Sequence, residues 1–162
     1  MRGPRNGRSL SQPPGLDVTH PRSLAREAAL KILYQLDVRA DLDPTTLFAE
    51  IDEAITDADA RRFARDLVLG ARAELTTIDA ELSAVAINWT LTRMAAIDRN
   101  VLRLGTFELL FRPDLPAAVS INEAVDLAKN YSTKDSGAFV NGILDKIRVR
   151  ATAPDRAAPS GS

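Results

Sequence analysis

The sequence of 162 residues lacks cysteine and has a single histidine, His20. Disulfide bonds and thiolate catalysis are therefore excluded, and we expect neither a zinc site of the common kinds nor a His-based catalytic site. No apolar run approaches the roughly 18 residues that cross a membrane, and no basic segment followed by an apolar one marks a signal peptide. These absences favour a cytoplasmic protein that uses no metal or cofactor and binds no membrane.

The sequence also lacks the short motifs of several enzyme classes. It has no P-loop, no G-x-G-x-x-G after a strand, no G-x-S-x-G and no H-E-x-x-H. Asp and Glu number 22, yet no pair of them stands out as an acid–base constellation. Glu108 lies in an apolar segment, where a buried carboxylate more often pairs with an Arg or a helix end than performs catalysis. We therefore assign no catalytic residue and favour a binding protein over an enzyme.

Charge is distributed unevenly along a chain whose net charge is −1. Residues 1–31 have a net charge of +4, and residues 37–59 have a net charge of −7. A basic amino-terminal end could bind a polyanion, although a solvated, disordered arm has the same composition. We expect residues 1–21 and 151–162, which are rich in Pro and small or polar residues, to be disordered tails. Residues 22–150 would form the folded domain.

Apolar residues recur at helical spacing through this domain, without convincing strand alternation. The spacing predicts helices over residues 23–38, 43–55, 59–75, 77–87 and 98–111, another opening at Pro116, and a last one ending near residue 150. Ser23 and Asp43 are expected to be N-caps, and the sequence STKD at 132–135 fits a capping box. Residues 98–111 are apolar on most sides, which indicates a central helix. The expected fold is all-α, with about seven helices in two packed small bundles.

Two features within these helices point to binding. Tyr34 lies roughly opposite the apolar face of its helix at 100° per residue, with Leu30 beside it. An exposed Tyr–Leu pair suits a protein partner, unless another helix of the same domain covers it.

The second feature is the stretch DSGAFVNGILDKI at 135–147, which places Phe139 in the first turn of a helix among small residues. A ring there could stack on a nucleotide base beside free N–H groups, or it could be an ordinary core residue. Gly142 weakens the helix by about 1 kcal/mol relative to Ala, which suggests the close approach of a neighbouring helix.

Four blocks, AREAALKILYQLD, MAAIDRNVLRLGTFELLF, VSINEAVDLAK and DSGAFVNGILDKI, resemble the NusB family of bacterial transcription antitermination factors. The resemblance covers residues 24–150 and implies an all-helical fold of two small bundles without catalytic activity. It further implies binding to the boxA element of ribosomal RNA leader transcripts. The implied partners are a small-subunit ribosomal protein that doubles as Nus factor E and the RNA polymerase antitermination complex.

Carried over by position, the resemblance implies roles for six residues. RNA would be contacted by the basic residues Arg22 and Arg26 and stacked by Phe139. The ribosomal protein would meet three further residues, namely Tyr34, Asp98 and Asp135.

The chain also departs from the family pattern. The Arg run before the first helix is thinned to HPRSLARE, and Ala138 stands where a Lys is common. Since each lost phosphate contact weakens binding, we expect weak RNA binding by the chain alone.

Two other functions remain open at this stage. One is a helical protein-interaction module, or a homodimer, without an RNA role. The other is a free-standing relative of the NusB-like domain that precedes some ribosomal RNA cytosine methyltransferases, although 162 residues leave no room for a methyltransferase domain. Salt-dependent RNA binding would distinguish the antitermination factor from the interaction module.

Overall fold

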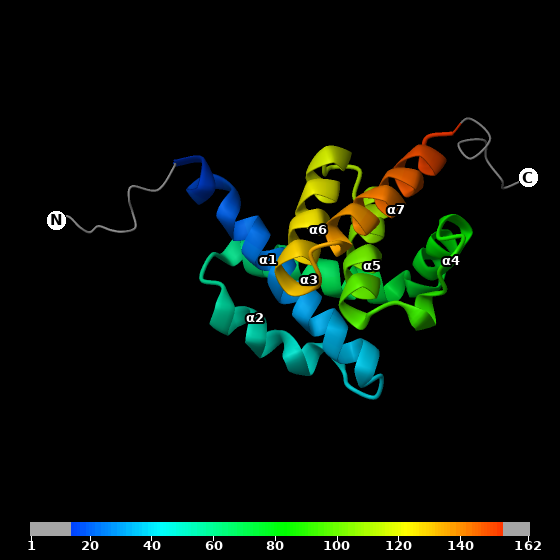
Figure 1. The fold of residues 1–162 in the computed structure, drawn as a ribbon. Coiled ribbons are helices and arrows are strands. Elements are labelled where there is room, and N and C mark those ends of the chain that lie inside the picture. Colours follow the sequence, from blue (N-terminus) through cyan, green and yellow to red (C-terminus); the bar gives the residue numbers. More distant parts are fainter. Residues whose placement is uncertain (1–13, 154–162) are drawn as a thin grey trace, which may run out of the picture.

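The computed structural model describes the backbone of residues 14–153 and the side chains of residues 21–153. Within these residues the chain forms seven α-helices and two short 3₁₀ helices, and no strand (Figure 1). The elements are α1 (Pro14–Val38), η2 (Pro44–Leu47), α2 (Phe48–Ala54), α3 (Ala58–Ala73), α4 (Leu75–Val85), η3 (Leu91–Arg93), α5 (Ala96–Phe111), α6 (Ala117–Tyr131) and α7 (Ser136–Ala151). The all-α prediction is confirmed.

The helices pack as two small bundles that meet at α5. In the first bundle α1 packs against α2 and α3, and in the second α5, α6 and α7 pack against one another while α4 contacts α5 and α7. The helix α5 also contacts α1 and α3, so it belongs to both groups (Figure 1). The prediction of a central helix over residues 98–111 is confirmed.

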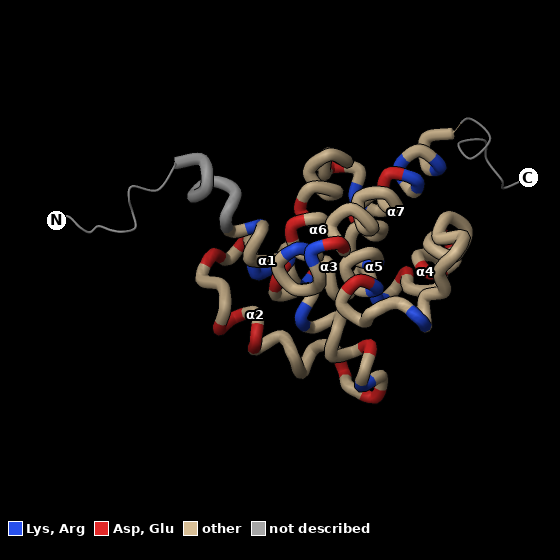
Figure 2. The backbone as a smooth tube through the Cα atoms, viewed as in Figure 1, with Lys and Arg blue, Asp and Glu red and all other residues tan. Residues whose placement is uncertain are grey.

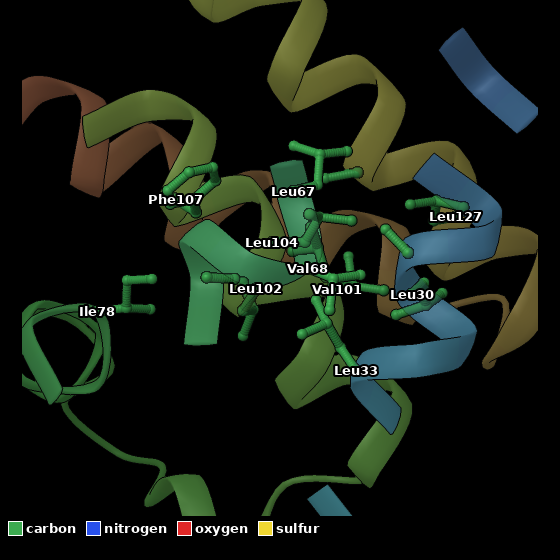
Figure 3. Close-up of a cluster of buried hydrophobic side chains, with 14 of the residues drawn as sticks. Leu30, Leu33, Leu67, Val68, Ile78, Val101, Leu102, Leu104, Phe107 and Leu127 are labelled. Carbon is green, nitrogen blue, oxygen red and sulfur yellow. The ribbon is translucent and has the colours of Figure 1, made fainter. Parts of the chain in front are cut away.

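Apolar side chains from both bundles form one continuous core (Figure 3). Leu30 and Leu33 of α1 meet Leu67 of α3 and Val101 and Leu104 of α5, and each of them is at most 5% exposed. The spacing of these residues along their helices is the 3.6-residue period on which the helix predictions rest. Burial of this shared face fixes the orientation of α1 and α3 relative to α5.

A polar network joins the end of α1 to α5 and α4. Asp37, in the last turn of α1, accepts hydrogen bonds from Arg99 (2.8 Å) and Asn100 (2.9 Å), and Arg103 lies 3.4 Å from its other oxygen. Arg103 also donates two hydrogen bonds to Asp79 of α4, at 2.8 and 2.9 Å. The network therefore fixes three helices of the two bundles at one point.

The predicted helix starts are right in one case and wrong in two. Asp43 caps η2, because its side chain accepts a hydrogen bond from the Thr45 N–H at 3.1 Å. Ser23 is not a cap: α1 already begins at Pro14, and the Ser23 hydroxyl donates to Glu123 of α6 at 2.9 Å. A side-chain partner in another helix thus replaces the backbone partner that the sequence pattern suggests.

The predicted capping box at 132–135 does not form. The helix α7 starts at Ser136, with Asp135 at the N-cap position but without a side-chain cap hydrogen bond. The hydroxyl groups of Ser132, Thr133 and Ser136 instead bond to one another at 2.9 to 3.1 Å. Residues 132–135 therefore form a turn whose hydroxyl groups are used within the turn.

The two predicted tails stay predictions, because most of their residues lie outside the described part of the chain. Residues 14–21, expected to be disordered, continue α1 through Pro21. Residues 1–13 and 154–162 lie outside the described part of the chain, as do the side chain of His20 and the three arginines at positions 2, 5 and 8. Of the helices in the described part, none has the length and apolar character that crossing a membrane requires.

Candidate functional site

A pocket of about 220 Å³ lies at the start of α7, and Phe139 forms part of its wall. The ring of Phe139 is partly buried and packs against the core. It also meets the ring of Trp89 edge to face, with ring centroids 5.4 Å apart and planes at 65°. Phe139 is therefore neither a fully buried core residue nor a free surface ring. Its predicted role as a stacking ring stays a prediction, and its position is compatible with that role.

Asp98 and Asp135 line the same pocket as Phe139. Asp98, in the first turn of α5, accepts a hydrogen bond from the Ser136 hydroxyl at 3.1 Å, which attaches the start of α7 to α5. Its other carboxylate oxygen, Oδ1, is buried and has no hydrogen-bond partner among the described residues. Buried polar atoms are usually paired, so this oxygen is an exception among the described residues. Asp135 is exposed at the pocket rim.

Tyr34 lies on a different part of the surface, on the outer side of α1. Its side chain is 37% exposed, as expected for a residue opposite the core face. Lys31, one turn earlier, places its ammonium group 5.6 Å from the ring centre of Tyr131 in α6. Leu30 is only 1% exposed, so the expected Tyr–Leu surface pair is wrong. The surface that remains for a partner consists of Tyr34, Lys31 and Tyr131.

Arg22 and Arg26 lie one turn apart in α1 but have different surroundings. Arg22 is exposed, and its guanidinium group lies 4.3 Å from the centre of the Phe63 ring. Arg26 is 3% exposed and donates two hydrogen bonds of 2.8 Å to Glu108 of α5. Ser120 of α6 also donates to Glu108, at 2.6 Å.

The buried position of Arg26 contradicts its predicted contact with RNA. Both faces of the Arg26–Glu108 pair are enclosed by helices, so a phosphate cannot reach the guanidinium group without disrupting the core. The expectation that Glu108 bonds an arginine is confirmed. Ala25 and Ala29, on either side of Arg26 along α1, are fully buried, but the sequence does not show which helix packs against Arg26.

Arg112 adds a second, half-buried cation near Phe63. Its guanidinium group lies 5.4 Å from the Phe63 ring centre and forms two hydrogen bonds with Asp114, at 2.9 and 2.8 Å. The hydrogen bond from Arg112 holds the pKa of the Asp114 carboxyl below its ordinary value. Asp114 compensates the charge of Arg112, so Arg22 is the cation at this end of α1 that stays available for a phosphate.

The predicted close approach at Gly142 is wrong. A methyl group added at Gly142 would have no heavy atom within 4 Å outside its own helix. Close helix contacts occur at other glycines: a Cβ at Gly105 would lie 2.7 Å from a methyl carbon of Leu144, and one at Gly137 would lie 3.0 Å from Lys129. Gly142 instead lines a surface groove next to Phe139.

Trp89 is 54% exposed and lies beside Phe139, and no pattern in the sequence predicts a role for it. Its signal in the sequence is weak, because a lone aromatic residue between two predicted helices has no periodic pattern to place it. In the described part of the chain, no three His, Cys, Asp or Glu side chains are arranged to hold a metal ion. The exposed groups of the site are aromatic rings, carboxylates, hydroxyls and scattered cations, which are suited to recognition by stacking and hydrogen bonding.

Comparison with known proteins places this arrangement in a family. The model of the NusB family matches residues 23–148. The transcription antitermination protein NusB of Sorangium cellulosum is 42% identical over 135 residues, which cover 83% of this chain and 96% of that protein. NusB of Myxococcus xanthus is 46% identical over 137 residues, covering 82% of this chain and 98% of that protein.

Solved structures agree with the sequence matches. The structure of T. maritima NusB superposes with a TM-score of 0.75 at 42% identity, and the match covers 83% of this chain and 95% of that one. A chain in a structure of the antitermination factors NusB and NusE in complex with double-stranded RNA superposes with a TM-score of 0.72 at 33% identity, covering 80% of this chain and 96% of that one. With a family model over most of its folded part and relatives above 40% identity along nearly their full length, this chain belongs to the NusB family.

Proposed function

We propose that the chain is a cytoplasmic transcription antitermination factor that binds boxA RNA together with a small-subunit ribosomal protein acting as Nus factor E. Relatives named transcription antitermination proteins support the process, and the related NusB–NusE structure with RNA supports the two kinds of partner. Through these contacts the chain would join the RNA polymerase antitermination complex during ribosomal RNA synthesis. The proposed role is that of an adaptor without catalytic activity.

One observation carries the proposal for this chain: a single pocket brings Phe139 together with Asp98 and Asp135. The ring is the candidate for stacking on an RNA base, and the two carboxylates are candidates for contact with the ribosomal protein. A bound protein would therefore lie directly beside a base held on Phe139. Joint binding is then expected to be tighter than binding of either partner alone, because the two adjacent ligands can contact each other as well as the chain, and this coupling raises the affinity of both.

The role proposed for the basic residues is smaller than the sequence suggests. Arg22 is retained as a phosphate contact, and Arg26 is withdrawn because Glu108 holds it in the core. Each phosphate contact contributes to affinity through the release of counterions. A chain with fewer exposed arginines at this position should bind RNA weakly by itself and depend on the ribosomal protein.

Fluorescence anisotropy with labelled boxA RNA tests the function directly. The titration uses boxA and scrambled RNA, with and without the ribosomal protein, at two salt concentrations. We expect sequence-selective binding that becomes tighter when the partner is present and weaker as salt rises. Equal, weak binding to both RNAs would instead favour an interaction module without an RNA role.

Two substitutions separate the proposed contacts. Phe139→Ala should weaken RNA binding roughly tenfold, within the range measured for loss of a stacking ring, while the circular dichroism melt changes little. Tyr34→Ala should weaken the ribosomal protein contact and leave RNA binding by the chain alone unchanged. A large loss of stability in Phe139→Ala would identify the ring as a core residue. Unchanged partner affinity in Tyr34→Ala would remove Tyr34 from the interface.

A further inference from the structure

A groove of about 360 Å³ runs between the end of α4 and α7, on the side of Phe139 away from the carboxylates. We call it the Trp89 groove; its polar or aromatic lining residues are Asn88, Trp89, Phe139 and Lys146, with Gly142 on α7. Its volume lies within the range of sites for small ligands. Trp89 and Phe139 line both this groove and the pocket at the start of α7, so the two rings form the wall that separates them.

We propose that the Trp89 groove binds one unstacked base of the same RNA, with Trp89 as a second stacking ring and Lys146 as the contact to a neighbouring phosphate. The proposal rests on RNA binding by the chain. It adds a specific site on the surface of α7 and two residues that the sequence does not mark.

The arrangement of the two rings supports a base as the ligand. Trp89 is 54% exposed although a side chain of its size gains much from burial. Trp89 and Phe139 meet edge to face at 65°, so their contact covers one face of one ring and leaves the other ring faces uncovered by it. Single-stranded RNA is recognised by such open aromatic faces, on which unstacked bases lie.

The groove is also shaped and charged for a nucleotide. Because Gly142 has no side chain and an added Cβ would meet nothing within 4 Å, the groove stays open along α7. The amide of Asn88 can donate and accept hydrogen bonds at a base edge. Lys146 is exposed and is the single charged side chain among the groove-lining residues of the described part.

Charge separates this site from the neighbouring pocket. The pocket at the start of α7 contains Asp98 and Asp135, which would repel a phosphate, whereas the Trp89 groove contains Lys146. A phosphodiester backbone is therefore favoured on the groove side of the aromatic wall, and a protein donor is favoured on the carboxylate side. This division gives each of the two proposed ligands its own side of Phe139.

The sequence offers a direct reporter, because Trp89 is its single tryptophan. Tryptophan fluorescence is measured while unlabelled boxA RNA is added to the full chain. The ribosomal protein is present at saturation, provided that it has no tryptophan or that its tryptophans have been replaced. We expect quenching that saturates at the same RNA concentration as the anisotropy signal, because a stacked base quenches indole emission. Binding seen by anisotropy without any change in emission would overturn the proposal.

Substitutions provide the second readout. Trp89→Ala should weaken RNA binding about tenfold, whereas Trp89→Phe, which keeps a ring, should stay within about threefold of the parent chain. Lys146→Ala should lower the slope of log affinity against log salt by about 0.7, the value per phosphate contact on a single strand. The matched control is Arg39→Ala, which removes an exposed positive charge beyond the end of α1, outside both proposed sites, and should leave the slope unchanged.

The outcomes distinguish this site from the proposed function. If the parent chain binds no RNA with or without the ribosomal protein, both proposals fail. If the parent chain binds RNA, and the variants Trp89→Ala and Lys146→Ala bind it as tightly as the parent chain does, only the Trp89 groove is excluded. If Trp89→Ala instead changes the sedimentation of the RNA-free chain and leaves RNA affinity intact, the groove is an interface between copies of the chain and the proposal is wrong.

Discussion

Arg22 and Arg26 illustrate how neighbouring residues of one type acquire different roles. Both are cations in the same part of α1, yet Arg22 is exposed over Phe63 and Arg26 is enclosed with Glu108. Removing one partner of a buried ion pair leaves the other charge without compensation and costs about 3–5 kcal/mol. A solvent-exposed arginine has no such role in stability. The positive charge of such an arginine is available to contact a ligand.

We therefore predict opposite effects for the two arginines. Arg22→Ala should weaken RNA binding and lower its salt slope by about 0.7, with an unchanged urea unfolding curve. Arg26→Ala should lower the free energy of unfolding by about 3–5 kcal/mol. The double variant Arg26→Met/Glu108→Leu removes both charges and should recover most of that stability.

RNA binding by this double variant decides whether Arg26 contacts the ligand. We expect the folded double variant to bind boxA RNA as well as the parent chain does, measured by anisotropy. An affinity as low as that of Arg22→Ala would mean that Arg26 reaches RNA after all.

Single residues are also where prediction from the sequence was least reliable. Periodicity placed Tyr34 outside correctly, since its direction depends only on its own helix. Leu30, Arg26 and Gly142 depend on which helix packs beside them, and no local pattern carries that information. The exposure of Trp89 likewise depends on how α7 packs against α4. The elements themselves were predicted well, because their apolar spacing is a local property of the sequence.

The helix α7 has two glycines that differ in the space beside them, and α5 has a third glycine that contacts α7. Gly137 is buried against Lys129 of α6, whereas Gly142 faces open space on the outer side of α7. Gly105 of α5 allows Leu144 of α7 to approach closely. The helical conformation alone would favour Ala at all three positions by up to about 1 kcal/mol. The packing around each glycine decides whether that position can accept Ala.

Gly142→Ala should stabilise the chain by about 0.4–1 kcal/mol, because Ala loses less conformational freedom on folding and meets no neighbour. Gly105→Ala should destabilise it by about 1–3 kcal/mol, because the new methyl group overlaps Leu144. Thermal melts of the two variants provide the comparison. A lower melting temperature for Gly142→Ala would show that the helix is already strained at this position.

The same substitution bears on the proposed site. A methyl group at position 142 would enter the Trp89 groove, so Gly142→Ala should combine higher stability with weaker RNA binding. That combination would give a reason for an exposed glycine where packing requires none.

At the scale of the whole molecule, Asp37 is the point where the two bundles are connected by charge. Partial burial raises the pKa of the Asp37 carboxyl, but hydrogen bonds from Asn100 and Arg99 and the charge of Arg103 outweigh it. The pKa therefore lies below its ordinary value of 3.8. A carboxyl whose pKa is lowered by folding stabilises the folded state fully above its unfolded pKa. That stabilisation is lost as pH falls through the folded pKa.

Asp37→Asn should therefore lower the free energy of unfolding at neutral pH, by about 1–3 kcal/mol for lost hydrogen bonds to charged groups. The difference between the variant and the parent chain should begin to shrink below the unfolded pKa of about 3.9 and disappear as pH falls through the lower folded pKa of Asp37. Urea unfolding at pH 7, 5 and 3 measures both effects. Asp126→Asn is the control, because Asp126 is exposed on α6 and its loss should leave the curves unchanged. A constant difference at every pH would contradict the role assigned to the Asp37 charge.

The acidic surface of α2 has a consequence for how a nucleic acid reaches the protein. Negative side chains cluster on α2 and on the segment before it, on the opposite side of the molecule from α7 (Figure 2). A polyanion that approaches the α2 side is repelled, whereas one that approaches from the α7 side is not. Productive encounters are therefore oriented before any contact forms, and added salt should weaken this orientation because it screens the repulsion from the α2 side.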